Sequence, residues 1–174
     1  MILIIATTNR KQSKTYNLAL YYQQLLVEFG VESDILTLEN LPVDFAFSAL
    51  YENNGKNEAF NVLRERFEDA SKYVYIIPEY NGSFPGVLKT FIDGLGWPSP
   101  LKNKKAALVG ISDGSLGGAH ALSHFTDILH YLHCNVLSLQ VRIPYMKKNY
   151  VDHKIQDEFI DKLMHEQAEA LIDF

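Results

Sequence analysis

The 174-residue sequence contains a single cysteine, Cys134. One cysteine excludes an internal disulfide framework and a zinc site built from cysteines, and it fits a reducing compartment, so we expect a cytoplasmic protein. Positive charge is also scarce, because 16 lysines and arginines stand against 21 aspartates and glutamates and leave a formal net charge of −5. Such a chain has no basic footprint for nucleic acid or for an anionic membrane surface.

Long apolar runs are missing as well. The first run, Ile2–Ala6, is shorter than the core of a signal peptide and follows no basic leader, and no stretch approaches the ~20 apolar residues of a membrane helix. The remaining composition, 47% hydrophobic and 21% charged, is typical of a globular chain that is long enough to bury its own core. We therefore expect one domain over residues 1–174 and no membrane partner.

Short apolar segments alternate with segments of helical periodicity along the chain. The apolar runs predict strands at residues 2–6, 34–38, 73–77, 106–111 and 135–141. Helical spacing lies between them: one helix is expected to end at Gly30, another to carry Pro85 in its first turn, and a terminal helix to bury Phe159, Ile160, Leu163 and Leu171. Residues 43–58 show no clean period. The alternation predicts an α/β fold with a doubly wound, five-stranded parallel sheet, whose common strand order is 2-1-3-4-5.

Three loops rich in hydroxyl groups, glycine or proline follow the first, third and fourth predicted strands. In the order 2-1-3-4-5 these strands are neighbours, so the loops are expected to meet at the edge of the sheet where such folds bind ligands. The first loop, residues 7–15, leads into a helix whose N-terminus, with the hydroxyls of Thr8, Ser13 and Thr15 and the charge of Arg10, suits a phosphate dianion. The alternative is that Ser13 only caps the helix. The loop is neither a Walker loop nor a dinucleotide-binding glycine loop.

The second loop, residues 78–86, reads PEYNGSFPG. Its prolines and glycines keep backbone N–H and C=O groups out of regular pairing, so these groups can meet the polar edge of a heterocycle while Tyr80 lies against its rim. A turn followed by a helix cap is the alternative. In the third loop, Ser112 and Asp113 supply polar atoms, and three glycines leave room for a planar group or, alternatively, mark a glycine-rich start of a helix.

These loops resemble those of the NAD(P)H-dependent FMN reductase family, which has a flavodoxin-like fold and includes quinone and azo reductases. The most specific match is PEYNGS with PGVLK and Ile92-Asp93. The first loop is similar to the family's S-x-R-x-x-S-x-N phosphate loop, with Thr7, Thr8 and Thr15 in place of its glycine, serine and asparagine, and the third to its S-x-G-x-x-G-G loop. The match extends from Ile2 into the fifth predicted strand.

The resemblance implies an enzyme with bound FMN, which NADPH or NADH reduces and which passes electrons to a small acceptor such as flavin, a quinone or an azo compound. It places the phosphate on Thr8, Arg10, Ser13, Lys14 and Thr15. It places the ring between the other two loops, on Pro78, Glu79, Tyr80, Asn81, Gly82, Ser83, Ser112, Asp113, Gly114, Gly117 and Gly118. No catalytic residue is expected, because the flavin performs the bond chemistry. A homodimer or homotetramer is also implied, and the aromatic segment 45–51 is a candidate subunit interface.

Other function classes stay open. A flavin-binding electron carrier or binding module would use the same three loops. A hydrolase can be drawn from Asp113, Ser115 and His120, although these residues lie in one short stretch and no G-x-S-x-G motif is present. His120 and His124 have metal-chelating spacing on a predicted helix, but no carboxylate or cysteine completes a set, so no metal site is expected.

Overall fold

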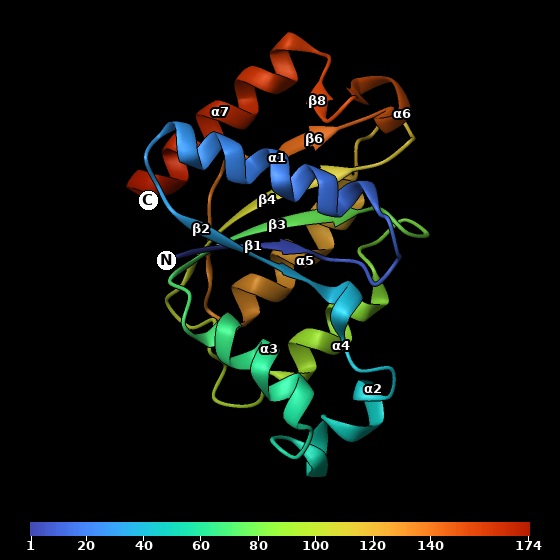
Figure 1. Cartoon of the computed structure of the whole chain (residues 1–174), viewed down its shortest axis with the longest axis vertical. Helices are drawn as coiled ribbons and strands as arrows, with labels where there is room; N and C mark the ends of the chain where they lie inside the picture. Colours follow the sequence, from blue (N-terminus) through green and yellow to red (C-terminus); the bar gives the residue numbers. More distant parts are fainter.

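The computed structural model describes residues 1–174, and its centre is a parallel sheet with helices on both faces (Figure 1). The strands lie in the order β2-β1-β3-β4-β5, and every neighbouring pair in this order is parallel. Their bounds are β1 (Ile2–Ala6), β2 (Ser33–Thr37), β3 (Lys72–Pro78), β4 (Lys105–Ile111) and β5 (Asn135–Val136). The predicted fold class and strand order are therefore confirmed.

Two groups of helices cover the two faces of the sheet (Figure 1). One face is covered by α1 (Lys14–Glu28) and α7 (Glu158–Asp173), and the other by α3 (Glu58–Glu68), α4 (Gly86–Gly94) and α5 (Ala119–Tyr131). Successive side chains of a strand point to opposite faces of the sheet. Ile4 therefore packs in the core under α1 and α7, and Ile5 packs in the core under α3, α4 and α5. Because both of their faces are buried, the central strands β1, β3 and β4 read as nearly continuous apolar runs. None of the helices combines the length and apolar character that crossing a membrane would require.

Most predicted boundaries agree with the structure to within about one residue. Helix α1 stops at Glu28, and Gly30 follows with a φ of +71° and donates its N–H to the carbonyl of Val27, which is the predicted glycine ending. Pro85 lies at the N-cap of α4 rather than inside its first turn. Its fixed φ of −60° still directs the chain into the helix.

The fifth predicted strand, residues 135–141, is wrong as one uninterrupted element. The structure has two short strands there, β5 and β6 (Val141–Ile143), and both pair with β4. Between them the fully buried side chain of Gln167, from α7, donates to the backbone carbonyls of Leu108 (3.0 Å) and Leu139 (2.7 Å). A side chain from a distant helix thus takes the place of ladder hydrogen bonds, which the local apolar pattern cannot reveal.

Several short elements lie outside the predicted alternation. They are the 3₁₀ helices η1 (Leu38–Asn40) and η2 (Tyr51–Asn53), the helices α2 (Phe45–Ser48) and α6 (Met146–Asn149), and the hairpin of β7 (Tyr150–Val151) and β8 (Lys154–Ile155). The prediction that Phe159 is buried is also wrong, because its side chain is 67% exposed. The buried stripe of α7 runs through Ile160, Met164, Ala168 and Leu171.

Candidate functional site

The loops after β1, β3 and β4 meet at the carboxyl edge of the sheet and line one cleft of about 450 Å³. Nine of the predicted site residues line it, namely Arg10, Ser13, Lys14, Thr15, Pro78, Glu79, Tyr80, Ser112 and Asp113. Four further lining residues were not predicted, namely Gln12, Ile111, Met146 and Lys147. Seven predicted residues are not part of this lining, namely Thr8, Asn81, Gly82, Ser83, Gly114, Gly117 and Gly118.

The first loop presents the N-terminus of α1 to the cleft. Ser13 is the N-cap residue, yet its side chain makes no capping hydrogen bond, so capping alone does not account for it. The hydroxyls of Ser13 and Thr15 line the cleft and have no hydrogen-bond partner in the chain. Two free hydroxyls beside the unpaired N–H groups of a helix start form a set of donors for an anion.

Thr8 lies beneath the cleft and joins the first loop to the second. It is 1% exposed, and its Oγ1 accepts a hydrogen bond from the N–H of Arg10 at 3.2 Å. The hydroxyls of Thr8 and Tyr80 share a hydrogen bond of 3.0 Å. The phenol of Tyr80 therefore points back to the first loop, whereas the sequence placed it against the rim of a ring.

The second loop contains a tight turn. Tyr80 and Ser83 exchange backbone hydrogen bonds of 2.8 and 3.1 Å, and Asn81 and Gly82 between them have φ values of +53° and +74°. Two central residues with positive φ are typical of a type I′ turn, for which Asn-Gly is a favoured pair. Asn81 and Gly82 are exposed, and the hydroxyl of the half-buried Ser83 lies 3.0 Å from Nδ1 of His124 in α5.

Glu79 brings an unpartnered acceptor to the cleft. Its N–H donates to the carbonyl of Ile111 at 3.0 Å, which fixes the backbone between β3 and β4. One carboxylate oxygen, Oε2, is buried and has no hydrogen-bond partner in the chain. A buried carboxylate oxygen without a donor is costly, so a ligand that brings N–H or O–H groups would stabilise it.

Two glycines of the third loop, Gly117 and Gly118, pack closely against the end of the sheet. A Cβ on Gly117 would lie 2.9 Å from the backbone nitrogen of Pro144, and one on Gly118 would lie 2.9 Å from that of Ile111. Both glycines also have positive φ, at +59° and +85°. Both glycines therefore lie against backbone atoms in this structure. The alternative interpretation of the third loop, a glycine-rich start of a helix, agrees with the N-terminus of α5.

A fourth segment, α6, completes the cleft and was missed by the sequence analysis. Lys14 Nζ donates to the carbonyl of Met146 at 3.0 Å, and the N–H of Met146 donates to the carbonyl of Ser112 at 3.1 Å. Lys147 contacts Asp113 twice, through its N–H at 3.2 Å and through Nζ at 3.3 Å. The only sequence signal for this wall is the basic pair Lys147-Lys148 after the last strand of an acidic chain.

The cleft is richer in positive charge than the chain as a whole. Three cationic side chains line it, from Arg10, Lys14 and Lys147, against two carboxylates, from Glu79 and Asp113. The chain itself carries a formal charge of −5. The cleft therefore suits one phosphate group with polar hydrogen-bond donors elsewhere in the same ligand.

The structure offers little for nucleophilic catalysis. No hydrogen bond joins Asp113, Ser115 and His120, and the Asp113 carboxylate is engaged by Lys147. Burial raises the pKa of the Cys134 thiol to about 12, so the thiolate needed for attack is not formed near neutral pH. No group of three or more His, Cys, Asp or Glu side chains is arranged to hold a metal ion.

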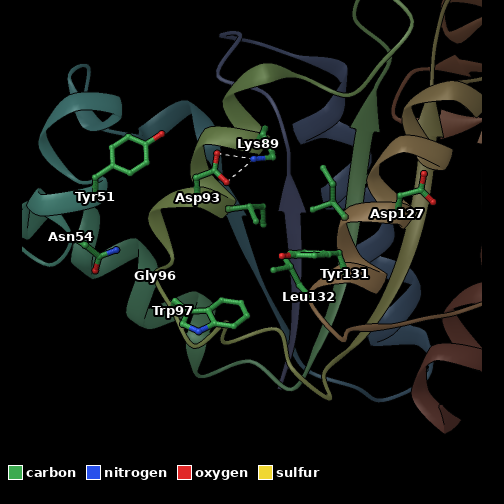
Figure 2. Close-up of a pocket in the computed structure, with 11 residues that line it drawn as sticks. Tyr51, Asn54, Lys89, Asp93, Gly96, Trp97, Asp127, Tyr131 and Leu132 are labelled. Carbon is green, nitrogen blue, oxygen red and sulfur yellow. Dashed lines mark hydrogen bonds and ion pairs between the residues drawn. The ribbon is translucent and has the colours of Figure 1, made fainter.

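A larger cavity, of about 830 Å³, lies between α4 and α5 (Figure 2). Its walls include Tyr51, Trp97 and Tyr131, whose side chains are 78–79% exposed, and the Lys89–Asp93 ion pair of 2.7 Å lies at its margin. Trp97 follows the C-terminus of α4, and Tyr131 is the last residue of α5. Because both helices start at the carboxyl edge of the sheet, their ends lie away from the cleft.

Comparison with known proteins gives a consistent result. A family model described as NADPH-dependent FMN reductase matches residues 1–147. An NAD(P)H-dependent FMN reductase of Pseudomonas aeruginosa is 27% identical over 179 residues, which cover 98% of this chain and 93% of the relative. A quinone reductase of Escherichia coli is 37% identical over 78 residues, which cover 44% of this chain and 42% of the relative. The solved structure of the flavoenzyme NAD(P)H:(acceptor) oxidoreductase of Paracoccus denitrificans superimposes with a TM-score of 0.75 at 23% identity, covering 99% of this chain and 94% of that one, and shows the same fold.

Proposed function

The chain belongs to the NADPH-dependent FMN reductase family, and we propose that it binds FMN in the cleft formed by its three loops and α6, using NADPH or NADH as reductant. One observation carries the proposal: residues from three loops far apart in sequence converge on one cationic cleft with free hydroxyls at a helix N-terminus. Bound FMN would supply the redox chemistry of the site, namely the transfer of a hydride from the nicotinamide and of electrons to the acceptor.

The residues of the cleft fit the two ends of FMN. Arg10, Ser13, Lys14 and Thr15 would hold the phosphate, because they combine two cations with two unpaired hydroxyls. Glu79, with its unpartnered Oε2, would accept a hydrogen bond from a ribityl hydroxyl or from an N–H of the ring. Thr8 would act from below by holding the first loop to Tyr80.

The ring would lie along the second and third loops. We propose contacts with Pro78, Glu79, Tyr80 and the exposed residues Asn81 and Gly82 on one side, and with Ser112, Asp113 and Gly114 on the other. Ser83 would contribute indirectly, by closing the turn through its backbone hydrogen bonds with Tyr80. Gly117 and Gly118 would contribute indirectly, by letting the third loop approach β4 and β6 closely. No side chain is needed as acid or base for hydride transfer to a flavin, so the role of these residues would be to orient the ring.

The acceptor is proposed to be a small molecule such as a quinone, a flavin or an azo compound. A quinone reductase is among the relatives, which supports the first of these. We also propose that residues 1–174 act as one domain, since both apolar cores pack on the two faces of one sheet. A cytoplasmic location is proposed from the single buried thiol, Cys134.

The larger cavity supports a homodimer. Phe47, Tyr51, Trp97 and Tyr131 are each more than 75% exposed. The last three gather on this cavity, and exposed apolar surface of this kind marks interaction sites. In a two-fold contact the same surface of the second copy would cover it. Of the predicted aromatic interface segment, Phe45 is buried against Phe60, at 5.7 Å between ring centroids, and is not available to a partner.

Light scattering tests the dimer. Trp97→Glu is expected to give a monomer, because a charge would be buried in the contact. Val27→Glu is the matched control, since Val27 is 64% exposed on α1, on the other side of the sheet. A monomeric wild-type protein at micromolar concentration would contradict the dimer.

The activity is tested by anaerobic spectroscopy. The purified protein is expected to bind FMN, and NADPH or NADH is expected to bleach the visible absorbance of the bound flavin, with reoxidation when a quinone is added. Bound FMN that neither nicotinamide bleaches would instead support the electron-carrier alternative. Failure to bind FMN would contradict the proposed site.

A further inference from the structure

His124 links α5 to the loop that follows β3. Its Nδ1 lies 3.0 Å from the Ser83 hydroxyl, and the next residue of α5, Phe125, packs edge-on against Phe84 at 5.3 Å between ring centroids. Two consecutive residues of the helix thus contact two consecutive residues of the loop, one pair polar and one apolar. No hydrogen bond from the side chain of His120 or His130, also on α5, accompanies this contact.

Helix α5 is itself held firmly. Phe125 is fully buried and packs on Tyr75 of β3 at 4.9 Å between ring centroids. The helix starts at Gly118, whose absent side chain lets the backbone approach that of Ile111. The position of His124 is therefore set by the sheet and by the third loop. Through its hydrogen bond to Ser83, the histidine in turn restricts the position of the second loop.

The turn between Tyr80 and Ser83 is held at both ends. Tyr80 shares a hydrogen bond with Thr8 of the first loop, and Ser83 shares one with His124. Asn81 and Gly82 between them are exposed and make no hydrogen bond of their own, because the backbone hydrogen bonds of the turn join Tyr80 and Ser83. An exposed turn with few contacts opens easily, so the two side-chain hydrogen bonds restrict it.

We propose that His124 is a positioning residue for the cofactor: through Ser83 it holds the Asn81-Gly82 turn where the second loop contacts the FMN ring. This inference rests on the proposed function. The hydrogen bond can form with either ring nitrogen protonated, because the serine hydroxyl can donate or accept. Loss of this one exposed hydrogen bond corresponds to about a three- to ten-fold weaker FMN affinity.

The test is a double-mutant cycle on FMN binding. His124→Ala, Ser83→Ala and the double variant are titrated with FMN by fluorescence quenching, and the visible spectrum of bound FMN is recorded for each. Each single variant is expected to raise the Kd about three- to ten-fold, and the double variant is expected to raise it no further, because both remove the same hydrogen bond. His124→Gln, whose amide can replace the ring nitrogen, is expected to recover part of the affinity.

His130→Ala, on the same helix, is the control and is expected to bind FMN like the wild type. Additive effects of the two single variants, or wild-type affinity in His124→Ala, would overturn the inference while leaving the proposed function intact. A lower melting temperature of FMN-free His124→Ala without any change in FMN affinity would overturn it too, since the histidine would then be merely structural. A wild-type protein that binds no FMN would overturn the proposed function and this inference together.

Discussion

Gly118→Ala tests whether the third loop needs its glycines for packing or for a ligand. Gly118 has a φ of +85°, and an added Cβ would lie 2.9 Å from the backbone nitrogen of Ile111 and 3.0 Å from Cα of Gly110. These are backbone atoms of β4 in the centre of the sheet, which cannot yield as the end of a flexible side chain can. We therefore expect Gly118→Ala to destabilise the protein even when no FMN is present.

The magnitude follows from two costs. A left-handed conformation costs a residue with a Cβ about 1–2 kcal/mol, and overpacking costs about 1–3 kcal/mol more. A total of about 3 kcal/mol corresponds, for a chain of this length, to a melting temperature lower by roughly 6–12 °C. Gly86→Ala is the matched control, because Gly86 is the first residue of α4, its φ is not positive, and an added Cβ would meet nothing within 4 Å. It is expected to raise stability by up to about 1 kcal/mol.

The assay is thermal unfolding of the FMN-free proteins by circular dichroism, followed by FMN titration of those that fold. If the ring rather than the sheet requires the glycine, Gly118→Ala will melt like the wild type and lose only FMN affinity. That outcome would refute the packing argument and restore Gly118 as a direct contact of the cofactor.

Three further predictions concern other parts of the chain. Ser13→Ala and Thr15→Val are each expected to raise the FMN Kd about 10-fold, since each removes one hydroxyl from the phosphate; unchanged titrations for both would contradict the site. Gln167→Leu is expected to lower the free energy of unfolding in urea by about 1–3 kcal/mol, because the buried carbonyl of Leu108 and the partly buried carbonyl of Leu139 lose their donor. Burial raises the pKa of Cys134 to about 12, so the folded state keeps a proton that the unfolded state releases near pH 9. The free energy of unfolding should therefore decline from about pH 9 to about pH 12. Iodoacetamide should label the thiol at pH 8 only after unfolding.

The fold could be predicted because each central strand is a short apolar run between helical segments, and that pattern is local. The fifth strand could not, since at its interruption the carbonyl of Leu139 accepts a hydrogen bond from Gln167, a residue roughly thirty positions away whose amide also donates to Leu108 of β4. Phe159 was misplaced for a related reason. Its spacing fits the edge of the helical stripe, but α7 packs through Ile160 and Met164 and leaves Phe159 in solvent.

The candidate site was partly predictable because strand order decides which loops meet. Once β1, β3 and β4 are neighbours, Ser13, Glu79 and Ser112 must lie at one edge of the sheet. The α6 wall escaped prediction because Met146 enters the cleft through its backbone, which accepts from Lys14 and donates to Ser112. Backbone contacts of this kind leave no mark on residue type.

The turn in PEYNGS shows why a local motif does not by itself define a binding loop. Asn81-Gly82 specifies the type I′ geometry, and residues 78–83 contain everything needed for that. The position of the turn depends instead on Thr8 and His124, which lie 72 and 41 residues from their partners Tyr80 and Ser83. If both side-chain hydrogen bonds are needed for FMN affinity, the second loop is positioned by the other two, and the three loops bind the cofactor as one unit.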